Sequence, residues 1–462
     1  MLVQFSFSNF KCFKDETVLN LTTSKKKNKE FYSFDTRFNY RVLKTMAVYG
    51  ANASGKSKLF EAVKFLKTLV LNAKDSEGDF LWKKKYDNFK LNTNSRDNSS
   101  SFEIVFIIDD NQYRYGVELT NEKIISEYLY VKDNKREVEV FKRSSGKISY
   151  NARFGAVAKL LIDRDMIKAD MPFLSALNEW NDKMAEKVIS WFQKLVIISC
   201  NDLPPVPNKY INEKTTKNFI LKFLKMFDIG IEDISIYEAP TYEIDGKIKK
   251  LFSEELLSKN SVYNGIKTTH SVYDEHYSAA DTVFFLMEKD ESFGTNRLLR
   301  LCLPLFTSSV VLIDEFDSGI HPNILNILIS MFYNFGDIKK QLVFNTHNSS
   351  LLSRDLDYEF MPADYFDSAS DIDLDIFKNE PNDISIKHPA KNKYKLLIKD
   401  QIYFVSKNRY GVASLVPLTD YKNIRSDLEQ LYLRGLLDGT PNIRHSIVES
   451  IISREGTQWD QI

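Results

Sequence analysis

The sequence predicts an α/β protein with a mostly parallel core sheet flanked by helices, and three observations support this prediction. Apolar runs at residues 45–49 and 310–313, and a third before Thr346, are typical of strands buried on both faces. Residues 102–143 form four alternating apolar and polar stretches separated by turn-forming residues, which predicts an antiparallel meander. Apolar side chains after residue 49 recur at helical spacing, at Leu59, Ala62, Val63, Leu66 and Leu69.

The other elements follow from the same periodicities. Residues 2–20 read as two antiparallel strands with a turn at 8–11, and residues 73–101 read as a loop. Helical periodicity returns at 173–194, before a short strand, and again at 215–227. The predicted organisation is an N-terminal lobe with the meander (1–170), a helical or arm insertion (171–280), a second lobe (281–353), an acidic insertion (354–390) and a C-terminal hairpin, turning near 408–411, with helices (391–462).

Residues 50–57, GANASGKS, match the pattern G-x-x-x-x-G-K-[ST] between a predicted strand and a predicted helix. A loop opened by glycines can aim several backbone N–H groups at one anion, and the next helix adds the positive end of its dipole. We therefore expect a nucleotide, with Lys56 neutralising the β and γ phosphates and Ser57 ligating Mg²⁺. An ordinary strand–turn–helix connection is the alternative. The expected phosphate-binding residues are Gly50, Ala51, Asn52, Ala53, Ser54, Gly55, Lys56 and Ser57.

The apolar run 310–313 ends in the adjacent carboxylates Asp314 and Glu315. Two such groups at the tip of a buried strand are costly to desolvate unless they bind something. We expect Asp314 to hold Mg²⁺ opposite Ser57, and Glu315 to orient and deprotonate an attacking water. This arrangement predicts an ATPase that hydrolyses its nucleotide. The alternative is a strand that ends in a solvated acidic turn.

Two further motifs bear on the same chemistry. His347 follows the next predicted strand, from which it could contact the γ phosphate, although a structural hydrogen bond is the alternative. Ser292, Gly294 and Thr295 open an amphipathic helix and offer a second anion-binding N-terminus. Because one ATP cannot easily use both termini of the same subunit, we expect a dimer in which this helix caps the γ phosphate held by the partner. An N-cap without a ligand is the alternative.

Composition sets the class of protein. The 462 residues can bury one large core or two to three smaller ones, and Lys plus Arg equals Asp plus Glu at 63 each, so no overall field attracts nucleic acid or anionic lipid. Three separated cysteines suggest neither disulfides nor a metal site. Without a membrane-length apolar run or a signal-like N-terminus, we expect a cytoplasmic protein with no membrane contact.

Residues 355–383 contain ten acidic residues and one basic residue, which indicates a solvated loop or a segment that docks on a basic partner.

Together the motifs resemble the ATP-binding-cassette fold of SMC and RecF-like ATPases, and in particular the abortive-infection and RloA-type ATPases of bacterial anti-phage systems. The resemblance implies an ABC-ATPase-like fold with an antiparallel β subdomain and a helical arm insertion, Lys11 near the adenine or ribose, and an ATP-bound head-to-tail dimer or higher oligomer. The segment ESFGT at 291–295 stands where this fold carries its signature motif, and it departs from the usual Ser-Gly-Gly-Gln. Gln112 is only a candidate for the glutamine loop of this fold. The matching segments are 9–13 (NFKCF), 50–57, 291–295 (ESFGT), 312–321 (LIDEFDSGIH), 345–348 (NTHN), 400–411 and 432–443.

Two functions are therefore expected. The first is an ATPase that senses or scaffolds in anti-phage defence, with a phage protein or nucleic acid as trigger and a separate toxin or nuclease as effector. The second is a DNA-repair or chromosome-maintenance ATPase, which the lysines at 25–29 and 83–85 would support. Intrinsic Toprim nuclease activity is not expected, because Ser406 and Lys407 stand where a metal-binding glutamate would be needed, and the alternating Asp371, Asp373 and Asp375 lack a flanking strand.

Overall fold

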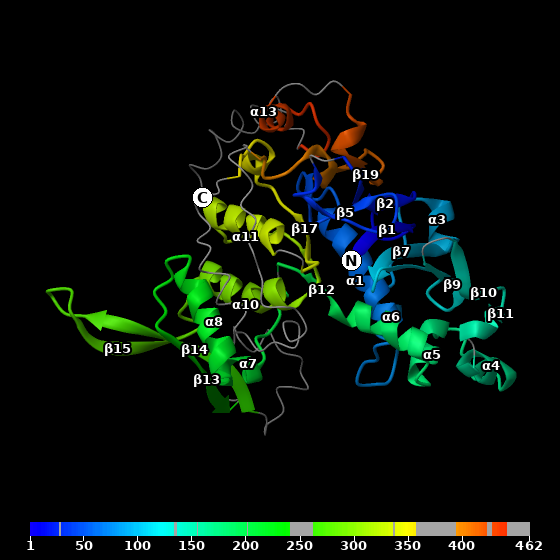
Figure 1. The fold of residues 1–462 in the computed structure, drawn as a ribbon, viewed down its shortest axis with the longest axis horizontal. Coiled ribbons are helices and arrows are strands. Elements are labelled where there is room, and N and C mark those ends of the chain that lie inside the picture. The colour runs from blue at the N-terminus through cyan, green and yellow to red at the C-terminus, as the bar shows by residue number, and fades with distance from the viewer. Residues whose placement is uncertain are drawn as a thin grey trace, which may run out of the picture.

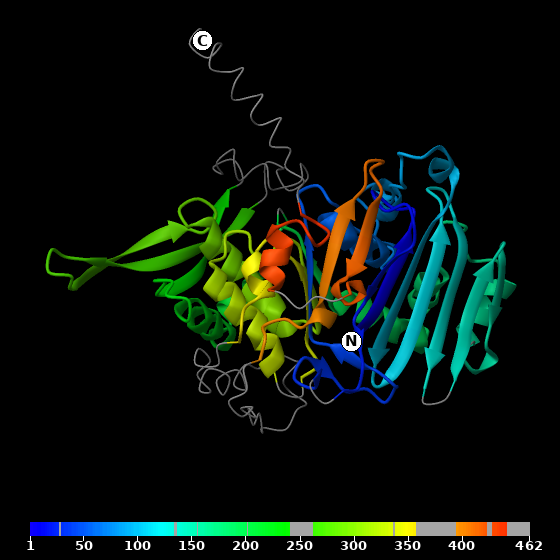
Figure 2. The ribbon, with the colours of Figure 1, turned by 90° about the horizontal axis from the view of Figure 1, so that it is seen from above.

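The computed structural model describes residues 1–26, 29–133, 136–154, 156–200, 202–240, 262–335, 338–356, 394–422 and 427–440. These residues form a mostly parallel core sheet with helices, a large antiparallel sheet at one end, and an arm at the other (Figures 1 and 2). The predicted α/β class, with an antiparallel β subdomain beside a parallel core, is confirmed. The proposed division into five segments stays a prediction.

The core sheet has six strands in the order β12-β16-β17-β6-β18-β19. All neighbouring pairs are parallel except β18 and β19, which form the predicted C-terminal hairpin. Every residue of β6, β16 and β17 is buried, which explains their nearly continuous apolar sequences. The strands are β6 (Thr45–Gly50), β12 (Leu195–Ile198), β16 (Val310–Ile313), β17 (Gln341–Asn345), β18 (Ile402–Lys407) and β19 (Ala413–Pro417).

The hydrophobic core lies on both faces of this sheet. In β16, Val310 and Leu312 join the cluster beneath α1 and α6, whereas Val311 and Ile313 join the cluster beneath α8, α10 and α11. The helix after β6 buries all five positions that its periodicity predicted. The helices are α1 (Lys56–Val70), α4 (Ala156–Asp163), α5 (Phe173–Glu179), α6 (Lys183–Lys194), α7 (Asn208–Asn212), α8 (Lys214–Lys225), α10 (Phe293–Thr307), α11 (Pro322–Asn334) and α13 (Leu428–Leu433).

The antiparallel sheet has seven strands in the order β11-β10-β9-β8-β7-β1-β2, so the predicted meander continues into the N-terminal strand pair. The segment 73–101, predicted as loop, also contains the single-turn helices α2 (Leu81–Lys85) and α3 (Thr93–Asp97). The strands of the sheet are β1 (Leu2–Ser8), β2 (Thr17–Asn20), β7 (Ser100–Ile108), β8 (Asn111–Leu119), β9 (Ile124–Lys132), β10 (Glu137–Ser144) and β11 (Lys147–Tyr150), and a smaller sheet holds β3 (Thr22–Thr23), β4 (Ser33–Phe34) and β5 (Arg41–Leu43).

The arm combines helices with strands. Helices α7 and α8 lie beside the arm strands, whereas α5 and α6 pack next to the antiparallel sheet, where Trp191 of α6 stacks on Phe106 of β7 (Figure 1). The chain after α8 is extended where it is described, in β13 (Asp233–Pro240), β14 (Val262–Tyr273) and β15 (Ala279–Leu286). Valine, threonine and tyrosine in β14 favour a pleated strand, and β15 pairs with it to form a hairpin that projects from the body (Figure 1).

Several predictions fall on residues outside those described. They are most of the acidic segment 354–390, part of the polar stretch 242–274, the middle of the lysine run 25–29, and the C-terminal helical segments beyond residue 440. Within the described ranges, no helix combines the length and the apolar character needed to cross a bilayer. Short 3-10 turns complete the fold at Ala152–Phe154, Ser349–Leu352, Lys399–Gln401 and Leu418–Asp420.

Candidate active site

A cavity of about 770 Å³ opens where β6, β16 and β17 end. Its wall brings together segments that lie far apart in the sequence, from the N-terminal turn to the C-terminal hairpin. The wall residues are Lys11, Cys12, Asn52, Ala53, Ser54, Gly55, Lys56, Ser57, Lys58, Asp87, Asn88, Phe89, Lys90, Leu91, Glu315, His347, Lys407 and Gly411.

The predicted phosphate loop connects β6 to α1, as the sequence indicated. Gly55 adopts a left-handed φ of 118°, and a Cβ there would lie 2.8 Å from Sγ of Cys12. A Cβ on Gly50 would lie 2.6 Å from the carbonyl oxygen of Val405. Both positions therefore require glycine, because the backbone comes too close to its neighbours for a side chain.

Lys56 lies in the loop with only 6% of its surface exposed. Its Nζ donates hydrogen bonds to the carbonyl oxygens of Gly50 at 2.7 Å and Ala51 at 2.9 Å. Burial lowers the pKa of the Lys56 ammonium to about 8, although the nearby carboxylates of Asp314 and Glu315 act in the opposite direction. The lysine therefore sits in the loop as a poorly solvated cation, for which a phosphate would be a strong partner.

Asp314 and Ser57 meet beside this cavity, at the end of β16. The Asp314 carboxylate is buried and accepts hydrogen bonds from the Ser57 hydroxyl and from Nδ2 of Asn345. Burial raises the pKa of Asp314, and these two hydrogen bonds partly oppose that rise. A buried carboxylate beside a hydroxyl offers the oxygen ligands that Mg²⁺ prefers, so the residues fit the predicted metal site.

Glu315 lines the cavity because the chain turns sharply after β16. Its φ of 51° lies in the left-handed region, which is unusual for a residue with a side chain and is often found at functional sites. Its backbone N–H donates to Oδ1 of Asn345 at 2.7 Å, and its carbonyl accepts a hydrogen bond from Nη2 of Arg297 at 2.5 Å. Hydrogen bonds thus hold the peptide groups on both sides of Glu315.

His347 reaches the same cavity from the end of β17, the strand next to β16. Its backbone N–H donates to Oδ2 of Asp317 at 3.1 Å. Burial lowers the pKa of the imidazole, and the Lys56 charge lowers it further. A neutral imidazole can donate from one ring nitrogen and accept at the other. The structure therefore brings Lys56, Glu315 and His347 into one cavity, while their roles stay predictions.

Lys11 also lines the cavity, on the turn after β1. Its Nζ donates to Oδ2 of Asp87 at 3.0 Å, and its backbone N–H donates to the Asp87 carbonyl at 2.7 Å. These bonds join the N-terminal turn to the loop 87–91, which the sequence analysis did not single out. The position of Lys11 beside the phosphate loop is compatible with its predicted place near the nucleoside.

The signature residues lie apart from this cavity. Ser292, Gly294 and Thr295 are described but are not among the wall residues, and Oγ of Ser292 accepts the Thr295 N–H at 3.0 Å to cap α10. A Cβ on Gly294 would lie 2.6 Å from the Gly319 carbonyl oxygen, so α10 packs closely on that turn. Gln112 also lies outside the wall, in β8, where it accepts the Tyr40 hydroxyl at 2.6 Å.

Asn345 and Arg297 are the residues of this site that sequence reasoning missed. Asn345 belongs to the quoted NTHN motif, and a polar residue at the end of a buried apolar strand was a usable signal. Arg297 gave no such signal, because an arginine in an amphipathic helix normally faces water. The hairpin residues Lys407 and Gly411 reach the cavity only through the tertiary fold.

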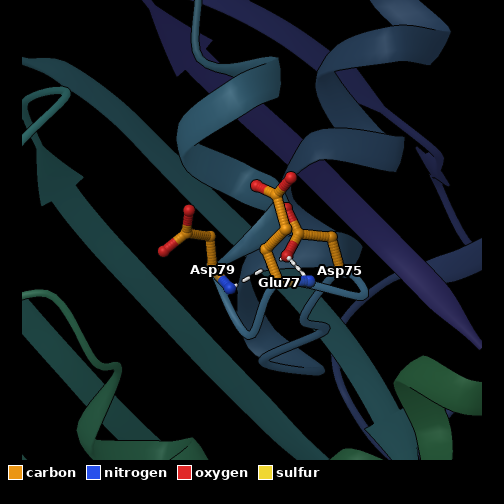
Figure 3. Close-up of side chains that lie close together, drawn as sticks. All are labelled: Asp75, Glu77 and Asp79. Carbon is orange, nitrogen blue, oxygen red and sulfur yellow. Dashed lines mark hydrogen bonds between the residues drawn. The ribbon is translucent and has the colours of Figure 1, made fainter.

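A separate acidic cluster lies in the loop after α1, at Asp75, Glu77 and Asp79 (Figure 3). Oδ1 of Asp75 accepts the N–H groups of Glu77 and Asp79, both at 2.9 Å, and Lys84 pairs with Oδ2 of Asp75 at 2.6 Å. These interactions order the turn. None of the three carboxylates lines the cavity described above.

Comparison with known families gives one match that covers well over half of the chain. Residues 46–353 match the family described as "AAA domain, putative AbiEii toxin, Type IV TA system". No curated protein matches. The matched range contains the phosphate loop, the signature, the acidic pair and His347, but neither Lys11 nor the C-terminal hairpin.

Among solved structures, the matches include SMC head domains. The SMC head domain from Thermotoga maritima is 12% identical, with a TM-score of 0.35, over 90% of this chain and 98% of that one. The Smc head domain with an extended coiled coil bound to the C-terminal domain of ScpA, derived from Pyrococcus furiosus, is 13% identical, with a TM-score of 0.33, over 91% of this chain and 97% of that one.

Proposed function

Because the chain belongs to the AbiEii-type AAA-domain family, we propose that it binds ATP with Mg²⁺ and hydrolyses it in the cavity at the ends of β6, β16 and β17. The observation that carries this proposal is the meeting of two distant motifs. The Ser57 hydroxyl of the phosphate loop is hydrogen-bonded to the Asp314 carboxylate. Lys56 lines the same cavity as Glu315 and His347. Bound Mg²⁺ would neutralise charge on the β and γ phosphates.

Each residue has a role that its contacts support. The Lys56 ammonium would exchange the loop carbonyls of Gly50 and Ala51 for phosphate oxygens. The Glu315 carboxylate, held by hydrogen bonds on both sides of its backbone, would accept a proton from the attacking water. His347, kept neutral by burial, would donate a hydrogen bond to the γ phosphate and so respond to its presence.

The signature favours action as a dimer or higher oligomer. The N-terminus of α10 does not line the cavity of its own chain, yet its free N–H groups form a ready anion site. A head-to-tail arrangement would place it against the γ phosphate of a second subunit. ATP would then link two subunits, and hydrolysis would release them.

The wider role that we propose is bacterial anti-phage defence, in which the nucleotide state of this ATPase controls a separate toxic effector. The family description, which names a toxin and a type IV toxin–antitoxin system, supports this context. A phage protein or nucleic acid would be the trigger. In cells, Lys56→Ala should abolish phage protection while the protein stays folded, and affinity purification of the wild type should recover a neighbouring gene product.

The biochemical test is phosphate release from ATP by the purified full chain. We expect Mg²⁺-dependent turnover that is lost in Lys56→Ala and in the presence of a chelator. As a matched control, Lys64→Ala changes a lysine on the solvent side of α1 that pairs with Asp202 at 2.7 Å. Equal turnover in Lys56→Ala and wild type would refute the assignment of the cavity.

Duplex DNA binding, the second expected function, receives less support from the contacts. Lys83 and Lys84 pair with Asp170 at 2.5 Å and Asp75 at 2.6 Å, and Lys29 pairs with Asp400. Each of these three lysines is therefore paired with a carboxylate, which reduces the positive charge that it offers to a phosphate backbone. If the purified protein bound duplex DNA with an affinity that falls steeply as salt concentration rises, the result would support this second function.

A further inference from the structure

Arg297 is a fully buried arginine on the second turn of α10, with 0% of its surface exposed. Within the described ranges it has no ion-pair partner, and its Nε has no hydrogen-bond partner. Its guanidinium donates instead to the carbonyl oxygens of Glu315 at 2.5 Å and Asp314 at 3.3 Å, and to Sγ of Cys200 at 3.4 Å. Burying a cation without a counter-charge is costly, so this arrangement indicates a specific role.

The carbonyl groups that Arg297 holds belong to the turn that aims Glu315 into the cavity. Glu315 is in the left-handed region, where a residue with a side chain is strained. Asn345 on β17 holds its N–H, and Arg297 on α10 holds its C=O. Loss of the second contact would free the turn to relax and would move the Glu315 carboxylate.

The same helix is locked to the turn 317–319 beyond the acidic pair. A Cβ on Gly294 would lie 2.6 Å from the Gly319 carbonyl oxygen, and a Cβ on Gly319 would lie 2.5 Å from the Phe293 ring. Sγ of Cys200, the thiol that contacts Arg297, donates to Oγ of Ser318 at 3.4 Å. The first turns of α10 and the residues 314–319 therefore form one closely packed unit.

We propose that Arg297 is a positioning residue that couples the N-terminus of α10 to the Glu315 carboxylate. This inference rests on the proposed ATP hydrolysis. A ligand that displaces Ser292 and Gly294 would also displace Arg297, because Ser292 caps α10 and the other two residues lie on its first two turns. Through its hydrogen bond, Arg297 would then shift the carbonyl group of Glu315. Contact made at the signature of one subunit would thereby adjust the water-activating residue of that same subunit.

The test compares Arg297→Met and Arg297→Lys with Arg300→Met in the full chain. Arg300 is a matched control, because it lies on the same helix and pairs with Glu288 at 2.9 Å but does not touch the acidic turn. For Arg297→Met we expect kcat to fall by about 10- to 100-fold, as a misplaced catalytic group would cause. KM and the Kd for a fluorescent ATP analogue should stay within about threefold of wild type, because the lost effect acts on turnover rather than on binding.

Rescue by the conservative variant separates coupling from folding. Arg297→Lys keeps the charge and can reach one of the two carbonyls, so its kcat should lie between those of Arg297→Met and wild type. Arg300→Met should keep kcat within about twofold. Thermal unfolding of each variant would establish that it is folded.

The outcomes distinguish this inference from the proposed function. Wild-type kcat in either Arg297 variant, with an active parent enzyme, would overturn the coupling and leave the ATPase assignment intact. A loss of ATP affinity equal to the loss of kcat would also overturn it. A wild type that fails to hydrolyse ATP would overturn both. If Arg297→Met does not fold, Arg297→Lys alone decides, since an unchanged kcat there contradicts the proposal.

Discussion

Nδ2 of Asn345, the last residue of β17, donates a hydrogen bond to Oδ1 of Asp314, which follows the neighbouring strand β16. The other end of the same amide accepts the backbone N–H of Glu315 at 2.7 Å. One side chain therefore fixes both the predicted metal ligand and the predicted base. The parallel register of β16 and β17 makes this contact possible, because it places the two strand ends at the same edge.

Replacing Asn345 by alanine should lower kcat by about 10- to 100-fold, the usual effect of removing a group that orients metal ligands. The hydrogen bond from Asn345 lowers the pKa of Asp314, so its loss should raise that pKa further. The acidic limb of the pH–rate profile should then move to higher pH. Asn348→Ala is the control, because that side chain only caps the turn Ser349–Leu352. An unchanged acidic limb would show that Asp314 does not govern it.

The variant Glu315→Gln should bind ATP but hydrolyse it at least about 100-fold more slowly, because an amide cannot accept the proton of the attacking water. With hydrolysis blocked, ATP-dependent dimers should accumulate on size exclusion. Glu232→Gln, which alters an ion pair with Lys225 on the arm, should behave as wild type. Unchanged turnover in Glu315→Gln would remove this residue from the role of base.

ATP binding should weaken as the pH rises above about 8, because burial lowers the pKa of Lys56 to about 8 from its ordinary 10.5. Above that pH the amine loses the charge that attracts phosphate, and the dissociation constant should rise by up to tenfold per pH unit. Lys56→Arg should remove this dependence, since a guanidinium stays charged throughout. Fluorescence titration with an ATP analogue between pH 7 and about 9.5 would measure the dissociation constants of the wild type and of Lys56→Arg. Identical pH profiles for the wild type and Lys56→Arg would contradict the proposal that the charge of Lys56 binds the phosphates of ATP.

Glu127 should stabilise the fold without acting on ATP. It is fully buried in β9, where it accepts the N–H groups of Phe173 at 2.6 Å and Leu174 at 3.0 Å and the Tyr115 hydroxyl at 3.0 Å. Glu127→Ala would leave these donors unsatisfied and should destabilise the protein by about 2 to 4 kcal/mol in urea unfolding. The exposed Glu122→Ala should change stability by less than about 0.5 kcal/mol. Turnover per folded molecule should be the same in both variants.

Sequence periodicity was informative wherever one residue pattern could form only one structure. The fully apolar β16 and the helical spacing in α1 predicted a parallel core, and the phosphate loop lies between β6 and α1 as expected. Periodicity failed in the arm, because β14 mixes apolar and polar residues on both of its faces and so lacks the alternation that marks a half-buried strand. It also failed for Arg297, whose burial depends on carbonyl groups contributed by a distant strand end.

The order of strands in the core sheet has a consequence for how the protein is made. β6, which leads into the phosphate loop, pairs with β17 on one side and β18 on the other, and both are translated long after it. The hairpin residue Gly411 then closes part of the cavity wall. A ribosome-bound chain that stops before this hairpin lacks the wall residues Lys407 and Gly411, so the cavity is complete only after residues 402–411 have been translated and have paired with β6.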